Sequence, residues 1–468
     1  MIAPMFEADS ANTPHGNDAA AASDGDGRTG KGHGKSLLGK IHGGRSHGNG
    51  SKGKSKILVM HASVGSGHRS AAEAIAYALQ QVIDSGIKVV PGQPDDIEVE
   101  VLDSLDFARV EIDGNKTASG FVGPTRPIYD VTWRYFFTGR ILWNGGEQWL
   151  NVMFPRFCTW VRENQPAAII CTHITAANIA VGARRKLKMD FPIICVPTDY
   201  EVEGLWPREY TDLFCAANGY MAETLRARRI PEERILVTGI PANPQFSKSY
   251  DREAARAKWD IEGDAKTVLV LAGAHLPKPY MRLRSTLAEF LPYMRELPDM
   301  QFVLVAGHDD EYQQSLNYSI YKEGIGNAKV LGYVDEIAEL MAACDLVVCK
   351  AGGLTVTECL DARKPMILLG KAYGQEKINV RMLTARGAAL HVQTARELFE
   401  ILQEIETDDS MVRSLLLDIE VVRRPYAALD IARAAIRMAY SPVSEEDRKR
   451  RSGYCTLLGI GDKPAHTR

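Results

Sequence analysis

The sequence predicts an α/β protein built from two facing Rossmann-like, doubly wound domains, and three observations lead to this fold class. Short β-branched runs such as 57–60, 168–171 and 193–196 alternate with helical stretches, which is the pattern of βαβ units and a parallel sheet. The series pauses at a proline-rich segment, 240–244, and restarts at 267–271. A length of 468 residues is too great for one ordinary domain and comfortable for two.

Composition narrows the class of protein. With 45% hydrophobic and 25% charged residues the chain reads as soluble and globular, and a net charge of −3 gives no general attraction to nucleic acid. Its eight cysteines form no CxxC pair, so they indicate buried thiols in a reducing cytosol rather than disulfides or a zinc site. No run approaches the roughly 18 apolar residues that span a bilayer. We therefore expect a cytoplasmic protein whose contact with a membrane is peripheral.

The order of the elements predicts how the chain is divided. The N-terminal tail holds eight Lys or Arg and no acid between Arg28 and Lys56, and its composition cannot bury enough apolar surface to order itself. The alternative for the tail is a basic arm that touches anionic lipid. The expected parts are a disordered tail at 1–55, an N-terminal domain at 56–245, a linker at 246–265, a C-terminal domain at 266–424, a helix at 425–441 that crosses back to the first domain, and a loose tail at 442–468.

The first chemical motif follows the first predicted strand. A small-residue turn leads into an alanine-rich helix, and Gly65 and Gly67 permit a tight turn with close backbone approach. The free N–H groups at the helix start favour an anion or a polar oxygen. His68 lies at this start and has an ordinary pKa near neutrality, so it is a candidate general base for an acceptor hydroxyl. The alternative is a histidine that only caps the turn.

Two further motifs follow predicted strands in the same half of the chain. His173 and Asp199 lie beyond the carboxyl ends of strands, where open α/β sheets place ligands. Asp199 is expected to orient or charge-stabilise His68, or to act as the base itself, against the alternative of a loop cap. For His173 a structural role is the favoured interpretation.

The strongest motif lies in the second half. Gly352 and Gly353 end a strand, and Leu354 with Thr355 opens a helix, so backbone N–H groups face any diphosphate placed there. Glu358, on the same helix, carries a carboxylate suited to accept both hydroxyls of a ribose. For the glycine pair, the alternative is a tight turn that binds no ligand. For Glu358, the alternative is an ordinary acidic residue near a helix N-terminus.

A last pair of polar residues follows the next predicted strand of the same half. Gln375 and Glu376 start another helix, from which their side chains can reach sugar hydroxyls.

Together these motifs resemble a family of lipid-acceptor glycosyltransferases, which includes the processive diacylglycerol glucosyltransferases of bacteria and the monogalactosyldiacylglycerol synthases of plastids. More distantly, the chain is similar to the enzyme that adds N-acetylglucosamine to the peptidoglycan lipid intermediate. The resemblance covers about residues 56–440. It rests on the shared order of segments 65–75, 198–200 with 205–206, 238–241 with 244–246, 272–275, 332–334, 350–358, and 374–376 with Asn379.

The resemblance implies a fold of the GT-B type and a UDP-sugar-dependent hexosyltransferase that inverts the anomeric centre without a metal or other cofactor. Its implied partners are a UDP-sugar, a lipid acceptor such as diacylglycerol and an anionic membrane surface. The candidate catalytic residues are His68, which the resemblance also implies, and Asp199, which its position after a strand suggests. The implied UDP-sugar contacts are His275, Gly332, Tyr333, Val334, Gly352, Gly353, Leu354, Thr355, Glu358, Gln375, Glu376 and Asn379. The implied acceptor or membrane contacts are Gly67, His173, Trp133, Phe136, Phe137 and Trp143.

Two departures from the family pattern leave the donor sugar open. Ala351 stands where the bacterial glucosyltransferases commonly have proline, and Asn243 stands where they usually have arginine. The lipid acceptor has support from segment 121–162, which holds four of the six tryptophans interleaved with arginines, a composition that suits a membrane interface. The same composition also suits an ordinary pair of core helices.

Other functions remain compatible with this fold, since a fold does not fix a function. They are a transferase for a soluble or polyprenyl-linked acceptor, a nucleotide-sugar epimerase, and a non-catalytic module that binds sugar nucleotides. For the transferase, breaking the anomeric bond builds positive charge on the sugar and negative charge on the diphosphate. The helix start at Gly353 is expected to stabilise the second charge in place of a metal.

Overall fold

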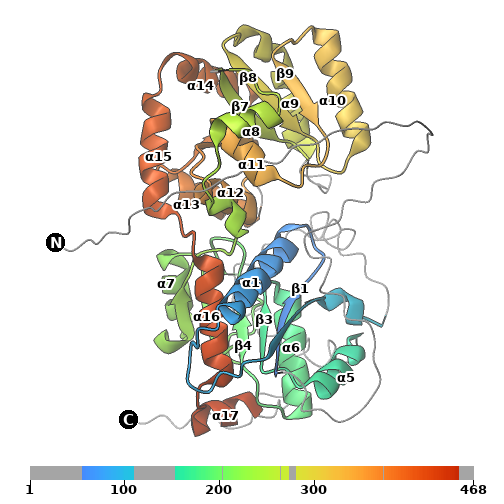
Figure 1. The fold of residues 1–468 in the computed structure, drawn as a ribbon, viewed down its shortest axis with the longest axis vertical. Coiled ribbons are helices and arrows are strands. Elements are labelled where there is room, and N and C mark those ends of the chain that lie inside the picture. The colour runs from blue at the N-terminus through green and yellow to red at the C-terminus, as the bar shows by residue number, and fades with distance from the viewer. Residues whose placement is uncertain are drawn as a thin grey trace, which may run out of the picture. The chain divides into compact units, whose positions relative to one another are not determined.

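The computed structural model describes residues 55–109, 153–202, 204–263, 265–273, 281–372 and 374–452. These residues form two six-stranded sheets with helices packed on them (Figure 1). Every pair of neighbouring strands is parallel. The predicted fold class is therefore confirmed, while the tail predicted before residue 55 lies outside the described residues.

The first sheet has the strand order β2-β1-β3-β4-β5-β6. The strands are β1 Ser55–His61, β2 Ile97–Asp103, β3 Ala168–Cys171, β4 Ile193–Cys195, β5 Leu213–Ala216 and β6 Ile235–Val237. Their helices are α1 Gly67–Asp84, α5 Pro155–Asn164, α6 Ile174–Leu187 and α7 Gly219–Ala227, with 3₁₀ turns at Ser104–Phe107 and Glu232–Arg234. The strand order reverses between β1 and β3, so the loops after these two strands flank the position where doubly wound folds bind ligands.

The second sheet has the order β12-β11-β10-β7-β8-β9 and reverses between β7 and β10. The strands are β7 Lys266–Leu271, β8 Met300–Val305, β9 Ala328–Leu331, β10 Leu346–Cys349, β11 Met366–Leu369 and β12 Leu390–Val392. The helices are α9 Met281–Phe290, α10 Asp310–Glu323, α11 Ile337–Ala343, α12 Gly353–Asp361, α13 Glu376–Thr384, α14 Ala395–Thr407 and α15 Ser410–Val422, with a 3₁₀ helix at Leu291–Glu296. By the same rule, the turn that joins β10 to α12 lies at a ligand position.

Strand β1 shows why these apolar runs become central strands. Its residues Ile57, Leu58, Val59 and Met60 are all fully buried. Alternate side chains point to opposite faces of a strand, and accordingly Leu58 and Met60 join one core cluster while Ile57 and Val59 join another. A strand covered on both faces has no polar side, so a continuous apolar run is what a parallel sheet requires.

The C-terminal part of the chain returns to the first sheet. Helix α16, Ala427–Tyr440, contacts α1 (Figure 1), and the two share a core in which Ile75 and Leu79 meet Ile431 and Ile436. A crossing helix is predicted at this place, at 425–441. The predicted domain boundaries themselves stay a prediction.

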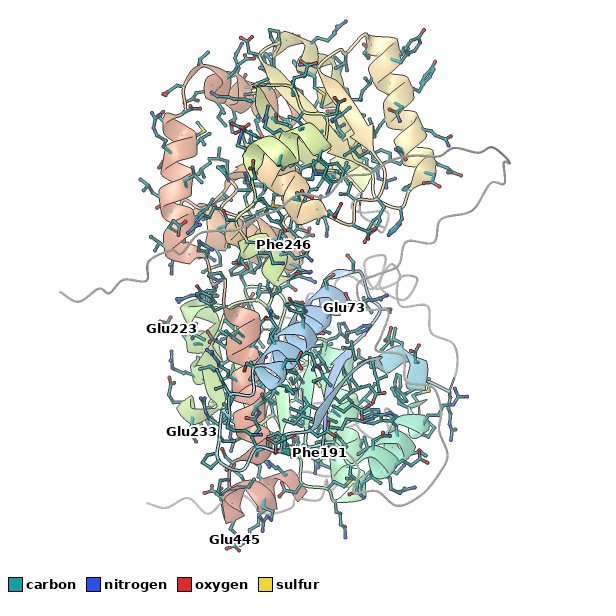
Figure 2. The ribbon with its side chains drawn as sticks, viewed as in Figure 1. Glu73, Phe191, Glu223, Glu233, Phe246 and Glu445 are labelled. Atoms are coloured by element: carbon teal, nitrogen blue, oxygen red, sulfur yellow. The ribbon has the colours of Figure 1, made fainter. Side chains whose placement is uncertain are left out.

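Two segments are more ordered than the sequence indicated. The predicted linker, 246–265, contains helix α8, Arg252–Lys258, and the end of a 3₁₀ turn, Pro244–Ser247, that begins in the predicted N-terminal domain. In the predicted loose tail, Glu445–Ser452 forms helix α17, whose first residue Figure 2 labels. Arg451 of this helix is only 3% exposed and binds Asp190 and Asp212. A buried acid far away in the sequence thus anchors a segment that its own composition marks as solvated.

That acid, Asp212, is the centre of a buried charge cluster. Its side chain is fully buried; Oδ2 lies 2.5 Å from Nη1 of Arg184, and Oδ1 lies 2.8 Å from Nη2 of Arg450 and 2.8 Å from Nε of Arg451. Arg184 also donates to the carbonyl of Phe191, labelled in Figure 2. Burial alone raises the pKa of the Asp212 carboxyl, but the three guanidinium groups outweigh burial and hold the pKa below its usual value.

We predict that Asp212→Asn destabilises the protein by about 3–5 kcal/mol, because it leaves buried arginines without a counter-charge. The lowered pKa means that the carboxylate's contribution is present above the unfolded pKa of about 3.9 and is lost as pH falls below it. Urea unfolding at pH 7 and at about pH 2, below the pKa of the unfolded carboxyl, measures both effects. Glu232→Gln, which breaks the exposed pair with Arg226, is the control and should change stability far less. Equal losses of unfolding free energy in Asp212→Asn and Glu232→Gln would contradict the stabilising role of the buried charge cluster.

Candidate functional site

The imidazole of His68 is held by two threonines at the carboxyl ends of neighbouring strands. Its Nδ1 lies 3.0 Å from the carbonyl oxygen of Thr172, after β3, and 3.0 Å from Oγ1 of Thr198, after β4. A carbonyl oxygen can only accept, so Nδ1 carries the proton and the Nε2 of the neutral ring presents its lone pair. Neither threonine was assigned a role from the sequence. Thr172 had the signal of its position directly after β3, and Thr198 that of belonging to segment 198–200, which carries part of the family resemblance.

The protonation of His68 suits a proton acceptor. The pKa of His68 is lowered to about 4, chiefly by burial; the hydrogen bond to the Thr172 carbonyl opposes this shift, and His61 adds to it. The ring is therefore neutral at pH 7 and its lone pair can accept a proton, but a pKa this low also makes the imidazole a weaker base than one that titrates near pH 7. The predicted general-base role has the geometry that it needs and stays a prediction.

His173 and His61 complete a group of three histidines around this position. His173 caps helix α6, because its Nδ1 accepts from the N–H of Thr175 at 3.1 Å, and its ring meets that of His68 edge-on at 4.5 Å. The cap agrees with the structural role favoured for His173. His61 is 6% exposed, and its Nδ1 has no hydrogen-bond partner among the described residues. The sequence assigned no role to His61, whose signal was its place at the end of β1.

Asn379 and Asp199 form a buried hydrogen-bond network. Nδ2 of Asn379 donates to Oδ1 of Asp199 and to the carbonyl of Ala351, each at 3.0 Å, and Oδ1 of Asn379 accepts from the N–H of Tyr200 at 3.0 Å. The amide therefore connects the loop after β4 with the turn after β10. Its predicted contact with a donor sugar stays a prediction, and the structure adds this internal role.

Asp199 has different neighbours from those expected. The sequence led us to expect that it orients His68, but the ring is oriented by the two threonines and the Asp199 carboxylate binds Asn379. Burial raises the pKa of Asp199, while the bond from Asn379 and the nearby Lys350 lower it. A raised carboxyl pKa keeps the alternative base role chemically open.

The turn between β10 and α12 has the form of an anion site. Gly352 is the N-cap in an extended conformation, and the helix begins at Gly353. The first N–H groups of a helix have no intrahelical acceptor, and they point at whatever lies before the helix. Gly67, at the start of α1, is close to this turn, since a Cβ on Gly67 would lie 3.7 Å from Cβ of Leu354. The two helix starts predicted to carry chemistry thus lie together.

A charged pair flanks the same turn. Nζ of Lys350, the residue directly after β10, lies 3.0 Å from Oε1 of the buried Glu376 and close to Gly352. Burial raises the pKa of Glu376, and Lys350 opposes that rise. Sequence reasoning included Lys350 in a motif without assigning it a role, and missed that its ammonium group brings a positive charge to the turn. Gln375, the N-cap of α13, precedes Glu376.

Glu358 lies on α12 with a carboxyl group that is partly buried. Burial and, to a lesser extent, the neighbouring Asp361 together raise its pKa to about 8. Glu358 is the sixth residue of α12, past the first turn near which the sequence placed it. A strongly perturbed carboxyl group is a candidate ligand contact. The predicted ribose contact is compatible with this placement.

The loop after β9 presents an exposed aromatic ring. Tyr333 is 56% exposed and stacks on His308 with ring centroids 3.7 Å apart, while Val334 behind it is buried. Gly332, Tyr333 and Val334 are predicted to hold a nucleotide base, and the stacked pair offers a flat surface there. The other predicted contacts His275, Trp133, Phe136, Phe137 and Trp143 lie outside the described residues.

The geometry is compatible with a site for group transfer. A neutral imidazole with a free lone pair lies near a helix start that favours anions, which is what is needed to deprotonate an acceptor and stabilise a departing anion. Within the described ranges, no cluster of three His, Cys, Asp or Glu side chains has the arrangement of a metal site. In the same ranges, none of the helices combines the length and the apolarity that crossing a bilayer demands.

Comparison with known proteins gives the family. Residues 68–242 match the model of monogalactosyldiacylglycerol (MGDG) synthase, and residues 267–413 match that of the glycosyltransferase family 28 C-terminal domain. The chain therefore belongs to the glycosyltransferase family that these two models describe, MGDG synthase and glycosyltransferase family 28, as the resemblance predicted.

One curated relative and two solved structures show the extent of the similarity. A processive diacylglycerol beta-glucosyltransferase of Bacillus subtilis is 29% identical over 260 residues, which are 56% of this chain and 66% of that protein. MurG of Acinetobacter baumannii is 14% identical, with a TM-score of 0.50 over 81% of this chain and 98% of that one. A putative UDP-N-acetylglucosamine 2-epimerase of Listeria monocytogenes is 12% identical, with a TM-score of 0.51 over 81% and 95%. The structural likenesses establish the fold alone.

We predict that Glu358→Gln raises the thermal stability of the ligand-free protein. A raised pKa means that the folded state favours the protonated carboxyl, so stability falls as pH rises from the unfolded value of about 4.3 toward 8. The amide does not titrate, and the gain in melting temperature should therefore grow between pH 5 and pH 8. Differential scanning calorimetry at several pH values measures it. Glu400→Gln, an exposed change on α14, is the matched control, and a pH-independent difference for Glu358→Gln would refute the account.

Proposed function

We propose that the protein transfers a hexose from a UDP-sugar to a lipid acceptor such as diacylglycerol, with inversion and without a metal ion. The observation that carries the proposal is the pairing of a neutral His68, its Nε2 lone pair free, with the anion-favouring start of α12. Family membership supports the reaction class.

The proposed reaction is a single displacement. Nε2 of His68 takes the proton of the acceptor hydroxyl, and the oxygen of that hydroxyl bonds to the anomeric carbon. The bond from the anomeric carbon to the diphosphate breaks, and UDP leaves with the electron pair. The N–H groups of Gly353, Leu354 and Thr355 stabilise the charge that develops on the diphosphate, and Lys350 adds a positive charge beside them.

The remaining contacts orient the donor. The Glu358 carboxylate accepts the ribose hydroxyls, and hydrogen bonds to a carboxylate favour its charged form, so binding would offset the burial that raises its pKa. Gln375 and Glu376 face the hexose, and residues 332–334 hold the base. Asp199 remains the alternative base.

The printed name of the Bacillus subtilis relative supports glucose and diacylglycerol as the first donor and acceptor to test. Peripheral association with the cytoplasmic face of an anionic membrane belongs to the same proposal. Epimerases share the fold, so an assay must separate transfer from epimerisation and from mere binding.

We predict that the purified protein moves labelled hexose from UDP-glucose or UDP-galactose to lipid in vesicles containing diacylglycerol, and that EDTA leaves the rate unchanged. Thin-layer chromatography of the lipid fraction, with NMR of the product's anomeric proton, measures transfer and inversion. Vesicles without diacylglycerol are the control. Conversion of the UDP-sugar without labelled lipid would favour an epimerase, and UDP binding without turnover would favour a binding module.

We predict that His68→Ala lowers kcat by about 10²–10⁴-fold, the usual contribution of a general base, and leaves the Kd for UDP unchanged. Because the pKa of His68 is about 4, the wild-type rate should fall only as pH drops through that value and stay level between pH 6 and pH 8. Steady-state kinetics and calorimetry measure these quantities. Gln80→Ala, an exposed change on the same helix, is the control. A His68→Ala enzyme with normal turnover would assign the base to another residue.

A further inference from the structure

We infer that Thr198 is a positioning residue that sets the spacing between His68 and the turn at the start of α12. The inference rests on the proposed function, because it gives the two sides of this spacing their roles as base and leaving-group site. Thr198 contacts both sides with different parts of one buried residue.

The side chain of Thr198 holds the imidazole. Its Oγ1 lies 3.0 Å from Nδ1 of His68, the nitrogen that also faces the carbonyl of Thr172. With only the carbonyl as partner, the ring would keep one anchor and could rotate about it. The hydroxyl supplies the second anchor, so the two contacts fix the direction of Nε2.

The backbone of Thr198 meets the turn. A Cβ on Gly353 would lie 2.0 Å from the carbonyl oxygen of Thr198 and 3.0 Å from Oδ1 of Asp199. Real side chains do not approach this closely, so the space that a side chain at position 353 needs is filled by Thr198. The glycine is therefore required by contact with the other sheet's loop, and this contact fixes how near the turn comes to His68.

Asn379 locks the contact in place. It bonds Asp199 and the N–H of Tyr200, the two residues that follow Thr198, and through the same Nδ2 it bonds the carbonyl of Ala351 just before the glycines. Since the Asn379 side chain is fully buried, water cannot easily replace these bonds. Thr198 is thus held against the turn independently of its own hydroxyl.

This separation of roles gives a specific expectation. Removing the hydroxyl should release the imidazole while Asn379 keeps the turn in place. A displacement of a reacting group by about 1 Å can lower the rate about 100-fold. We therefore expect the loss in kcat and not in donor binding.

The test compares Thr198→Val, which keeps the shape and loses the hydroxyl, with Thr198→Ser, which keeps the hydroxyl. Thr198→Val should lower kcat about 10- to 100-fold and leave the KM for the donor and the calorimetric Kd for UDP within twofold. Thr198→Ser should restore most of kcat. In protein labelled with ¹⁵N-histidine, the His68 signals, assigned with His68→Gln, should show a sharp Nδ1–H resonance in the wild type. In Thr198→Val the Thr172 carbonyl still selects the Nδ1–H tautomer, but the resonance should shift and broaden because the ring keeps only one anchor.

Thr224→Val on α7, which removes a hydroxyl bonded to the carbonyl of Tyr220, is the matched control and should change none of these readouts. Unchanged kcat and unchanged His68 signals in Thr198→Val would overturn the inference, and so would a fall in UDP affinity as large as the fall in kcat. If the wild-type protein had no transferase activity, that result would contradict the proposed function and not the role of Thr198. In that case the ¹⁵N signals and UDP affinity of Thr198→Val still decide whether Thr198 orients His68.

Discussion

The close contact between Thr198 and Gly353 is the constraint on which the rest of the site depends. The two residues belong to loops that follow strands of different sheets, and the contact is possible only because position 353 has no Cβ. Asn379 then supplies the hydrogen bonds that keep the two loops together. Without this contact, the imidazole of His68 and the start of α12 would be two separate features with no fixed distance between them.

The electrostatics of the site work against stability. Burial raises the pKa of Asp199, Glu358 and Glu376, which means that each carboxylate costs free energy in the ligand-free protein. Clusters of perturbed groups of this kind are typical of functional sites, where a ligand supplies the missing partners. Lys350 compensates part of the charge, and the helix start attracts the anion that would supply more.

Stability comes from elsewhere in the fold. The central strands are covered on both faces, α16 packs against α1, and the Asp212 cluster ties α17 to the first sheet. The Asp212 cluster lies at the amino end of β4, since Asp212 accepts from the N–H of Ile193, and so it supports the sheet from the end opposite to the site loops. Stability from the core and function in the loops is the arrangement expected of an α/β fold, in which loops on a rigid scaffold carry the function.

The sequence by itself determined the two parallel sheets, because buried strands are apolar runs. It also placed His68 and the Gly352–Gly353 turn at helix starts and Glu358 on the helix that follows the turn. Only the tertiary structure decided which side chains meet. His68 and Thr198 are separated by 130 residues, and Asn379 and Asp199 by 180. Local periodicity carries no information about such pairs. For the same reason α17 escaped prediction, since its order depends on Asp212, a partner 239 residues from Arg451.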